Sequence, residues 1–293
     1  MTVSGLDKLD KNTPCLFISN HRDIAMDPAF VNVALYDDDR ETVRIAIGDN
    51  LLTKEFTSDL MRVNKSFIVK RSASGRREKL AALFQLSGYI RHSLTKEHVS
   101  IWIAQREGRA KDGIDKTDPA LLKMLALSKQ KEQTFADAIG ELNVVPVAIS
   151  YELDPLDAAK GFELYAKQTE GVYLKDEHED FASIYSGVVG RKGVVHVAFG
   201  EPLVSGLDSP DEMAVAIDRQ IIGNYHLHPT NIIAYEQLGE AVATVAEWKA
   251  GMECDWPKAV REFTDRMNAI PATYRDIVIA MYANPVRQKL NLS

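Results

Sequence analysis

The sequence predicts an α/β protein whose mostly parallel central sheet is flanked by helices and followed by a helical C-terminal region. Three observations favour this fold. Short apolar runs rich in β-branched residues recur through the first 200 residues, and segments with helical periodicity separate them. From residue 208 onward only helical patterns occur. We therefore expect an α/β domain over residues 1–204 and a helical region over residues 205–293 that packs on it.

Six segments have the composition of strands, and each is apolar with little alternation, as strands buried on both faces are. They are Cys15–Ser19, Val43–Ile47, Ser66–Val69, Val99–Ala104, Val144–Ser150 and Val194–Phe199. Alternation of these strands with helices predicts parallel pairing. Pro146 interrupts the fifth strand, which favours a bulge or an edge position there because proline cannot donate a ladder hydrogen bond.

The helical segments have apolar residues at three- and four-residue spacing. Asp27 and Pro28 open the first. The second runs from Leu80 to Ile90, and Leu121–Ile139 follows Asp118, an N-cap residue with proline next to it. In the C-terminal region, four prolines predict helix breaks at Pro229, Pro257, Pro271 and Pro285.

Composition excludes several classes of protein. Of the 293 residues 45% are hydrophobic and 26% are charged, which is unlike collagen, coiled coils or disordered chains. No apolar run approaches the length of about 18 residues that predicts a membrane span, and the N-terminus lacks the apolar core of a signal peptide. Cys15 and Cys254 cannot form a disulfide framework. We expect a cytoplasmic protein.

Positive charge is concentrated in one short stretch of this acidic chain. The net charge of −7 argues against a nucleic-acid partner. Residues 65–79 nevertheless carry six lysines and arginines against one glutamate. Such a local patch indicates either a specific anion site or a solvated helix start.

The strand that ends at Ser19 is followed by a polar loop containing His21, Asp23 and Asp27. Open α/β sheets bind ligands at the carboxyl ends of their strands. A histidine beside a carboxylate forms the minimal general base, because the carboxylate fixes the tautomer and stabilises the imidazolium. Asp27 could instead serve only as a helix cap.

The sequence argues against two other interpretations of this loop. The order His-Arg-Asp also opens the catalytic loop of protein kinases, but the asparagine that this loop requires is replaced by Pro28. A metal site would need further ligands at typical spacing, and the neighbouring sequence supplies no additional histidine or cysteine.

Two more strands end in candidate binding residues. Lys70 and Arg71 follow the third strand, where cations suit a phosphate group. The fourth strand leads into a turn containing Glu107, Gly108, Arg109 and Lys111, in which the glycine permits close backbone approach.

Taken in order, these motifs resemble the four sequence blocks of the glycerolipid acyltransferase family, the glycerol-3-phosphate and 1-acylglycerol-3-phosphate acyltransferases. The resemblance covers about residues 3–203 and includes Ser150-Tyr151-Glu152 and Phe199-Gly200-Glu201-Pro202, which look more like the glycerol-3-phosphate branch. Two departures occur. Five residues rather than four separate His21 from Asp27, and Arg106 precedes Glu107.

The resemblance implies transfer of a fatty acyl group from acyl-CoA or acyl carrier protein to glycerol-3-phosphate, in phospholipid biosynthesis. The alternative acceptor is lysophosphatidate, and a more remote alternative is a non-catalytic lipid- or anion-binding protein. His21 would be the base, oriented by Asp27 or, because of the insertion, by Asp23. No metal or redox cofactor is implied. The residues expected to bind substrate are Arg22, Lys70, Arg71, Glu107, Gly108, Arg109 and Lys111.

Membrane contact is expected to be peripheral, on the inner face of the cell membrane. An acylated product must leave into lipid, yet no segment spans a bilayer. Leu51, Leu52, Phe56 and Leu60 lie beside the basic stretch and could rest on an anionic surface, or they could belong to the core.

Overall fold

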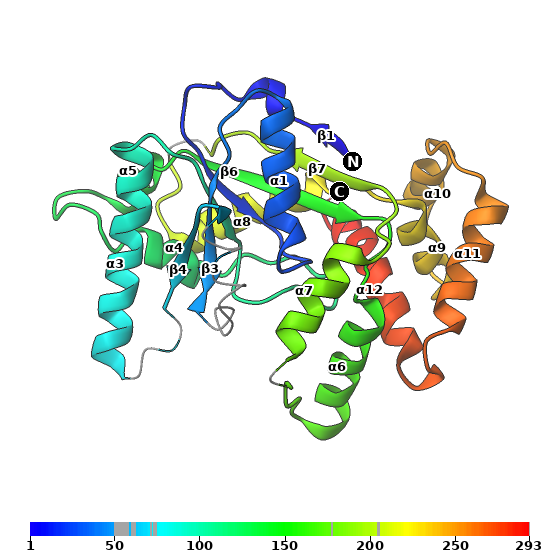
Figure 1. Ribbon diagram of the computed structural model, residues 1–293. Coiled ribbons are helices and arrows are strands. Elements are labelled where there is room, and N and C mark those ends of the chain that lie inside the picture. The colour runs from blue at the N-terminus through cyan, green and yellow to red at the C-terminus, as the bar shows by residue number, and fades with distance from the viewer. Residues whose placement is uncertain are drawn as a thin grey trace.

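The structure is a computed structural model that describes residues 1–49, 59, 63–70, 72, 75–176, 178–203 and 206–292. Seven strands within these residues form one sheet in the order β1-β7-β6-β2-β5-β3-β4 (Figure 1). Their bounds are β1 Thr2–Ser4, β2 Leu16–Ser19, β3 Arg44–Gly48, β4 Ser66–Val69, β5 Ile101–Ala104, β6 Val144–Tyr151 and β7 Val195–Phe199.

Pairing in the sheet is mostly parallel, so the predicted α/β class is confirmed. Strands β6, β2, β5, β3 and β4 run the same way, whereas β7 is antiparallel to β6 and β1 is parallel to β7. All six predicted strands are present. Sequence patterning missed β1, because its three residues are exposed and carry no apolar run.

The predicted edge position of the strand containing Pro146 is wrong, since β6 lies between β2 and β7. Pro146 is tolerated there for a local reason. The amide and carbonyl of one residue in a strand point to the same side, and the Pro146 carbonyl accepts a 2.8 Å hydrogen bond from the amide of Gly200. The β6–β7 pairing begins only at Val147, so the missing amide would face the end of β7.

Helices cover both faces of the sheet. Successive side chains along a strand point to opposite faces, so they contribute alternately to two hydrophobic cores. Within the described residues, the helices up to α8, the first helix of the C-terminal region, are α1 Met26–Asp37, α3 Arg76–Thr95, α4 Pro119–Leu125, α5 Phe135–Gly140, α6 Asp157–Glu170, α7 Glu179–Val189 and α8 Pro210–Asn224. Phe17 and Val145 pack on one face with α1, and Leu16 and Ile18 pack on the other with α3 and α8.

The helix predicted over Leu121–Ile139 is two helices, α4 and α5. Asp118 caps α4 as expected, accepting a hydrogen bond from the amide of Ala120. The chain then leaves the helix through a polar run, and Thr134 starts α5 with a capping box to Asp137. The N-cap at Thr134 therefore starts a second helix, although the apolar residues continue at helical spacing from the first helix to the second.

Four helices form the rest of the C-terminal region, at the right of Figure 1. They are α9 Pro229–Gln237, α10 Ala243–Ala250, α11 Trp256–Asn268 and α12 Ala272–Leu290. Their core, which includes Phe263 and Val278, is separate from the two cores of the sheet. Helix α8 instead places Ile217 and Ile221 against the sheet.

The predicted break at Pro285 is wrong, because this proline is buried inside α12. Proline removes the hydrogen bond to the carbonyl four residues earlier, here that of Met281. The backbone of Gly113 occupies the space beside this carbonyl: a Cβ atom on Gly113 would lie 2.1 Å from the oxygen. A neighbouring segment, rather than a helix end, thus accommodates the proline.

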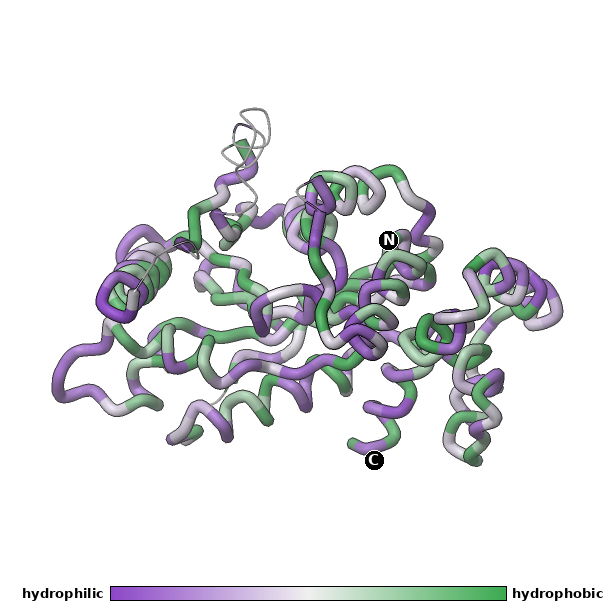
Figure 2. Tube along the Cα trace, turned by 90° about the horizontal axis from the view of Figure 1, so that it is seen from below, coloured by the Kyte–Doolittle hydropathy of each residue, from purple (hydrophilic) through white to green (hydrophobic). Residues whose placement is uncertain are grey.

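None of the helices in the described part of the chain is long and apolar enough to cross a membrane. Figure 2 shows hydrophilic and hydrophobic residues interspersed along the outer helices. The leucines and phenylalanine proposed to contact a membrane, Leu51, Leu52, Phe56 and Leu60, lie outside the described residues. Peripheral membrane contact stays a prediction.

Three histidine rings form a cluster where β7 meets the segment that leads to α9. The His226 ring lies 4.9 Å from the rings of both His196 and His228. His196 bonds to the hydroxyls of Thr2 and Ser4 in β1, and His228 Nε2 lies 3.1 Å from the Ser150 hydroxyl. Burial and the adjacent imidazole lower the pKa of His196 to about 4 and that of His228 to about 3.

We expect this histidine cluster to make the fold sensitive to acid. Unfolded histidines take up protons below pH of about 6.5, whereas His228 in the fold stays neutral almost to pH 3. The free energy of unfolding should therefore fall as the pH drops below about 6.5, by up to about 1.4 kcal/mol per pH unit from His228 alone. Urea unfolding between pH 7 and pH 4 measures this slope. An unchanged slope in His228→Gln would contradict the prediction.

Candidate active site

The polar loop after β2 lies at the carboxyl end of a central strand, between the ends of β5 and β6. His21 Nδ1 lies 2.7 Å from Asp27 Oδ2. Helix α1 begins at Met26, so Asp27 stands in its first turn and its carboxylate reaches back to the loop. The histidine and the aspartate therefore form a pair despite the five residues between them.

The Asp27 carboxylate is fully buried and accepts four hydrogen bonds. Besides His21, the amides of Arg22 and Asp23 donate to Oδ2 at 2.6 and 2.9 Å, and the Tyr151 hydroxyl donates to Oδ1 at 2.7 Å. Burial alone would raise the pKa of Asp27, but the bonds from His21 and Tyr151 lower it below its usual value. Asp27 therefore stays ionised and can stabilise a charged His21.

Asp23 occupies a different place in the same loop. Its Oδ1 accepts hydrogen bonds from the amides of Ala25 and Met26, so Asp23 caps α1 while Asp27 contacts His21. Its Oδ2 is buried against Gly187 of α7 and has no hydrogen-bond partner within the described residues. Burial, together with the charge of Asp27, raises the pKa of Asp23. In this arrangement Asp27 contacts the His21 ring, and Asp23 accepts the hydrogen bonds from amides at the start of α1.

His21 also contacts β5 and the loop that follows it. Its ring lies edge-on to that of Trp102, 5.7 Å away, and its carbonyl accepts a 2.8 Å hydrogen bond from the amide of Ala110. Ala110 stands between Arg109 and Lys111, so these two cations flank a residue that is bonded to the histidine. The His21 side chain remains 14% exposed and thus open to a substrate.

The two cations are held by helices that cover the loop. Arg109 Nη2 lies 3.4 Å from the Ser183 hydroxyl of α7, and Lys111 pairs with Glu163 of α6. Glu163 also bonds to Lys167, at 2.7 Å. Burial lowers the pKa of Lys111 although Glu163 opposes the shift. Gly108 has a φ of 77°, which favours glycine in this turn.

A family model described as Acyltransferase matches residues 1–150 of this chain, which is just over half of its length. The chain belongs to the acyltransferase family. The predicted family and enzyme class are therefore confirmed.

This acyltransferase is also similar to the solved structure of the 1-acyl-sn-glycerophosphate (LPA) acyltransferase PlsC from Thermotoga maritima. The two are 14% identical with a TM-score of 0.43, and the match covers 86% of this chain and 73% of the other. No curated protein sequence matches this chain.

Arg22 of the acyltransferase is buried rather than open to a substrate. Its two terminal nitrogens each donate a 2.7 Å hydrogen bond to the Asp115 carboxylate, and one also lies 3.3 Å from the carbonyl of Gly113. Only 7% of the residue is exposed. The structure thus places Arg22 in a contact between the histidine loop and the loop after β5.

The basic strand end lies farther from the histidine. Lys70 follows β4, which is separated from β2 by β5 and β3, a span of about 14 Å at the usual strand spacing. Arg71 lies outside the described residues. Glu107 stands in the same turn as Arg109, after β5.

Sequence reasoning missed Tyr151, Asp115 and Asn20 in the site. Tyr151 bonds to Asp27, and Asn20 bonds to both Asp115 and the backbone of Ile149. The pattern Ser-Tyr-Glu did mark Tyr151 as part of the family resemblance, although not as a neighbour of the base. The described residues contain no group of three or more side chains that could hold a metal ion.

Proposed function

We propose that this acyltransferase moves a fatty acyl group from a thioester, acyl-CoA or acyl carrier protein, to a hydroxyl of glycerol-3-phosphate. The observation that carries the proposal is the His21–Asp27 pair, joined through Ala110 to two cations of the next loop. A base beside a phosphate-binding group suits an acceptor that contains both a hydroxyl and a phosphate.

The proposed chemistry needs no covalent enzyme intermediate. Because Nδ1 of His21 faces the Asp27 carboxylate, Nε2 is the nitrogen that removes the proton of the acceptor hydroxyl. The hydroxyl oxygen attacks the thioester carbonyl, the new C–O ester bond forms, and the C–S bond breaks. The proton on Nε2 then passes to the leaving thiolate. The buried charge of Asp27 stabilises the imidazolium between these steps.

Arg109 and Lys111 are the proposed phosphate ligands. Arginine presents two parallel N–H donors to a phosphate, and a lysine adds a point charge. Among the residues that the structure describes, the only hydrogen bond of the Arg109 side chain is the long one, 3.4 Å, that it donates to the Ser183 hydroxyl oxygen. Lys111 already pairs with an anion, the Glu163 carboxylate, and a substrate phosphate is an anion of the kind that could pair with Lys111 in the same way.

Purified protein assayed with acyl-CoA and glycerol-3-phosphate tests the proposal. A parallel assay with lysophosphatidate distinguishes the second acceptor, which has the same phosphate and one acyl chain more. Faster transfer to lysophosphatidate would correct the acceptor. Binding of phosphate without transfer to either acceptor would favour a non-catalytic lipid- or anion-binding protein.

Replacing Arg109 with lysine should raise the KM for glycerol-3-phosphate and leave the KM for the acyl donor unchanged. Losing a hydrogen bond to a charged group costs about 1.5–3 kcal/mol, which corresponds to about 10- to 150-fold. Steady-state kinetics with each substrate varied in turn measure the effect. Arg106→Lys in the same turn is the control, because Arg106 lies beside Asp112 and the Ile114 carbonyl instead. Equal losses for donor and acceptor would remove Arg109 from the phosphate site.

A further inference from the structure

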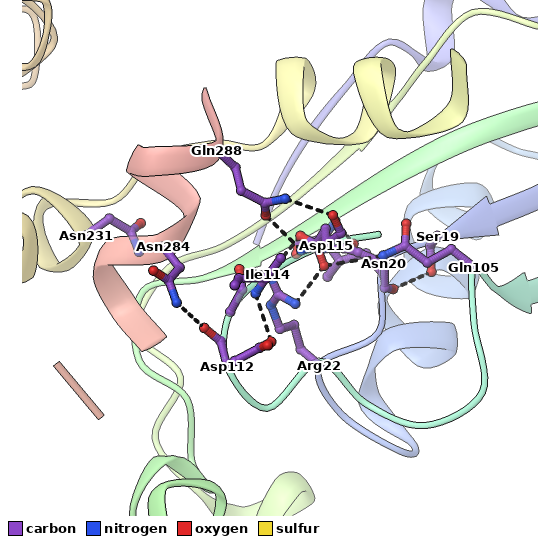
Figure 3. Close-up of polar contacts among 12 residues, drawn as sticks. Ser19, Asn20, Arg22, Gln105, Asp112, Ile114, Asp115, Asn231, Asn284 and Gln288 are labelled. Atoms are coloured by element: carbon purple, nitrogen blue, oxygen red, sulfur yellow. Dashed lines mark hydrogen bonds and ion pairs between the residues drawn. The ribbon is translucent and has the colours of Figure 1, made fainter. Parts of the chain in front are cut away.

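Helix α12 contacts the loop that joins β5 to α4, at residues 112–115 (Figure 3). The helix lies beyond the residues that the family model matches. It packs against α6 and α9, and two of its amide side chains extend toward the loop. This contact joins the helical region to the part of the chain that carries Arg109.

Gln288 makes the closest connection. Its Oε1 accepts a 2.7 Å hydrogen bond from the amide of Asp115, and its Nε2 donates a 2.8 Å bond to the carbonyl of the same residue. One turn earlier, Asn284 Nδ2 donates a 2.7 Å bond to the carbonyl of Asp112. Both ends of a four-residue segment are thus bonded to the same helix.

Gly113, between these two anchor points, lies against the carbonyl of Met281. Its φ is 76°, and a Cβ atom at this position would lie only 2.1 Å from the Met281 carbonyl oxygen. Both observations require glycine here. The carbonyl is open to this approach because Pro285 supplies no amide to it. Gly113 and Pro285 are far apart in the sequence, yet both allow the same close contact between the loop and the Met281 carbonyl.

The anchored segment leads directly to the base. The Asp115 carboxylate binds both terminal nitrogens of Arg22 and also accepts a bond from Asn20. Arg22 and Asn20 are the two neighbours of His21 in the chain. A continuous series of bonds thus runs from α12 through Asp115 to both sides of the histidine, and Figure 3 shows most of its members.

We propose that Gln288 and Asn284 are positioning residues for acyl transfer. Gln288 acts through Asp115 and Arg22, and Asn284 holds the same loop at Asp112, so that together they set the position of His21 relative to Arg109. This inference rests on the proposed function, because it takes His21 as the base. Displacing a base by about 1 Å can cost about 10²-fold in rate. Loosening one anchor should have a smaller effect.

The test compares two methionine substitutions in α12. Gln288→Met keeps the length of the side chain and removes both bonds to Asp115. Arg275→Met is the matched control, since within the described part of the chain Arg275 donates only to carbonyls of Asn268 and Ile270, at the other end of the helix. Both are assayed at a temperature at which circular dichroism shows them folded. Asn284→Ala serves as a second variant if Gln288→Met does not fold.

We expect Gln288→Met to lower kcat about tenfold, with the KM for the acyl donor unchanged, and Arg275→Met to keep the wild-type kcat. Equal kcat losses in the two variants would overturn the inference, since that outcome reports the general stability of α12. A wild-type kcat in Gln288→Met would overturn it as well.

Hydrogen exchange keeps this test separate from the proposed function. Gln288→Met should speed amide exchange at Asp115 and at Arg22 and Asp23, whose amides donate to Asp27. Faster exchange confined to Asp115 would overturn the inference whether or not the protein transfers acyl groups. The wild-type protein could fail to acylate either acceptor, while Gln288→Met still speeds exchange at Arg22 and Asp23. That result would reject the proposed acceptors and retain the link from α12 to the histidine loop.

Discussion

Replacing His21 with alanine is expected to reduce the rate of acyl transfer by at least about 10²-fold while the protein stays folded. The imidazole is the group proposed to remove the acceptor proton, and general-base catalysis contributes roughly 10²–10⁴-fold. His21 is partly exposed, so truncating its side chain leaves no large cavity in the core. Single-turnover rates with acyl-CoA and glycerol-3-phosphate, together with circular dichroism, measure both effects.

His92→Ala is the control for this experiment, because His92 lies on the exposed side of α3 and has 61% of its side chain accessible. It should transfer acyl groups at the wild-type rate. A folded His21→Ala protein that turned over nearly as fast as the wild type would remove His21 from the role of base.

Replacing Asp27 with asparagine is expected to lower kcat by about 10²-fold or more, because the neutral amide no longer stabilises the imidazolium that forms when His21 takes up the proton. The fold should survive. The amide oxygen can accept from His21 Nδ1 and from the amides of Arg22 and Asp23, and the Tyr151 hydroxyl can turn to accept from the new NH₂ group. The pH dependence of kcat in the two proteins measures the loss of the base.

Asp23→Asn and Tyr151→Phe separate the contributions to this effect. Asp23 Oδ1 caps α1 and its Oδ2 is unpaired among the described residues, so an asparagine can keep the cap and remove a buried charge. We expect activity within a few-fold of wild type. Tyr151→Phe removes one of the four donors to Asp27 and should have an intermediate effect. A larger loss from Asp23→Asn than from Asp27→Asn would transfer the orienting role to Asp23.

Local sequence patterns predicted most of the sheet because its strands are apolar runs, and β2 and β6 are buried along their whole length. Apolar runs identified β2 to β7, and the cap at Asp118 placed the start of α4. The errors arose where tertiary context decides. Whether Pro146 lies at an edge depends on the length of β7, and whether Pro285 breaks a helix depends on Gly113, more than 170 residues away in the chain.

The candidate site divides in the same way. His21 and Asp27 are six residues apart, so their pairing follows from one loop and one helix start. The partner that holds Arg22 is 93 residues away, the Tyr151 donor to Asp27 is 124 away, and the Gln288 anchor of Asp115 is 173 away. The spacing of residues along the sequence cannot predict contacts over such separations. The family resemblance therefore implied Arg22 as a substrate ligand, whereas its surroundings in the fold place it in a buried ion pair.

The antiparallel pairing of β7 with β6 has a consequence for the newly made chain. Strand β6 ends at Tyr151 and β7 begins at Val195, and all eight residues of β6 are buried in the finished sheet. At about 5–20 residues per second, the ribosome needs roughly 2–9 s to add the residues in between. During that time one side of an apolar strand has unpaired backbone groups, which a second nascent chain can bind. Ribosomes that stall in this interval should therefore release fragments that aggregate, whereas a release after β7 leaves β6 paired on both sides.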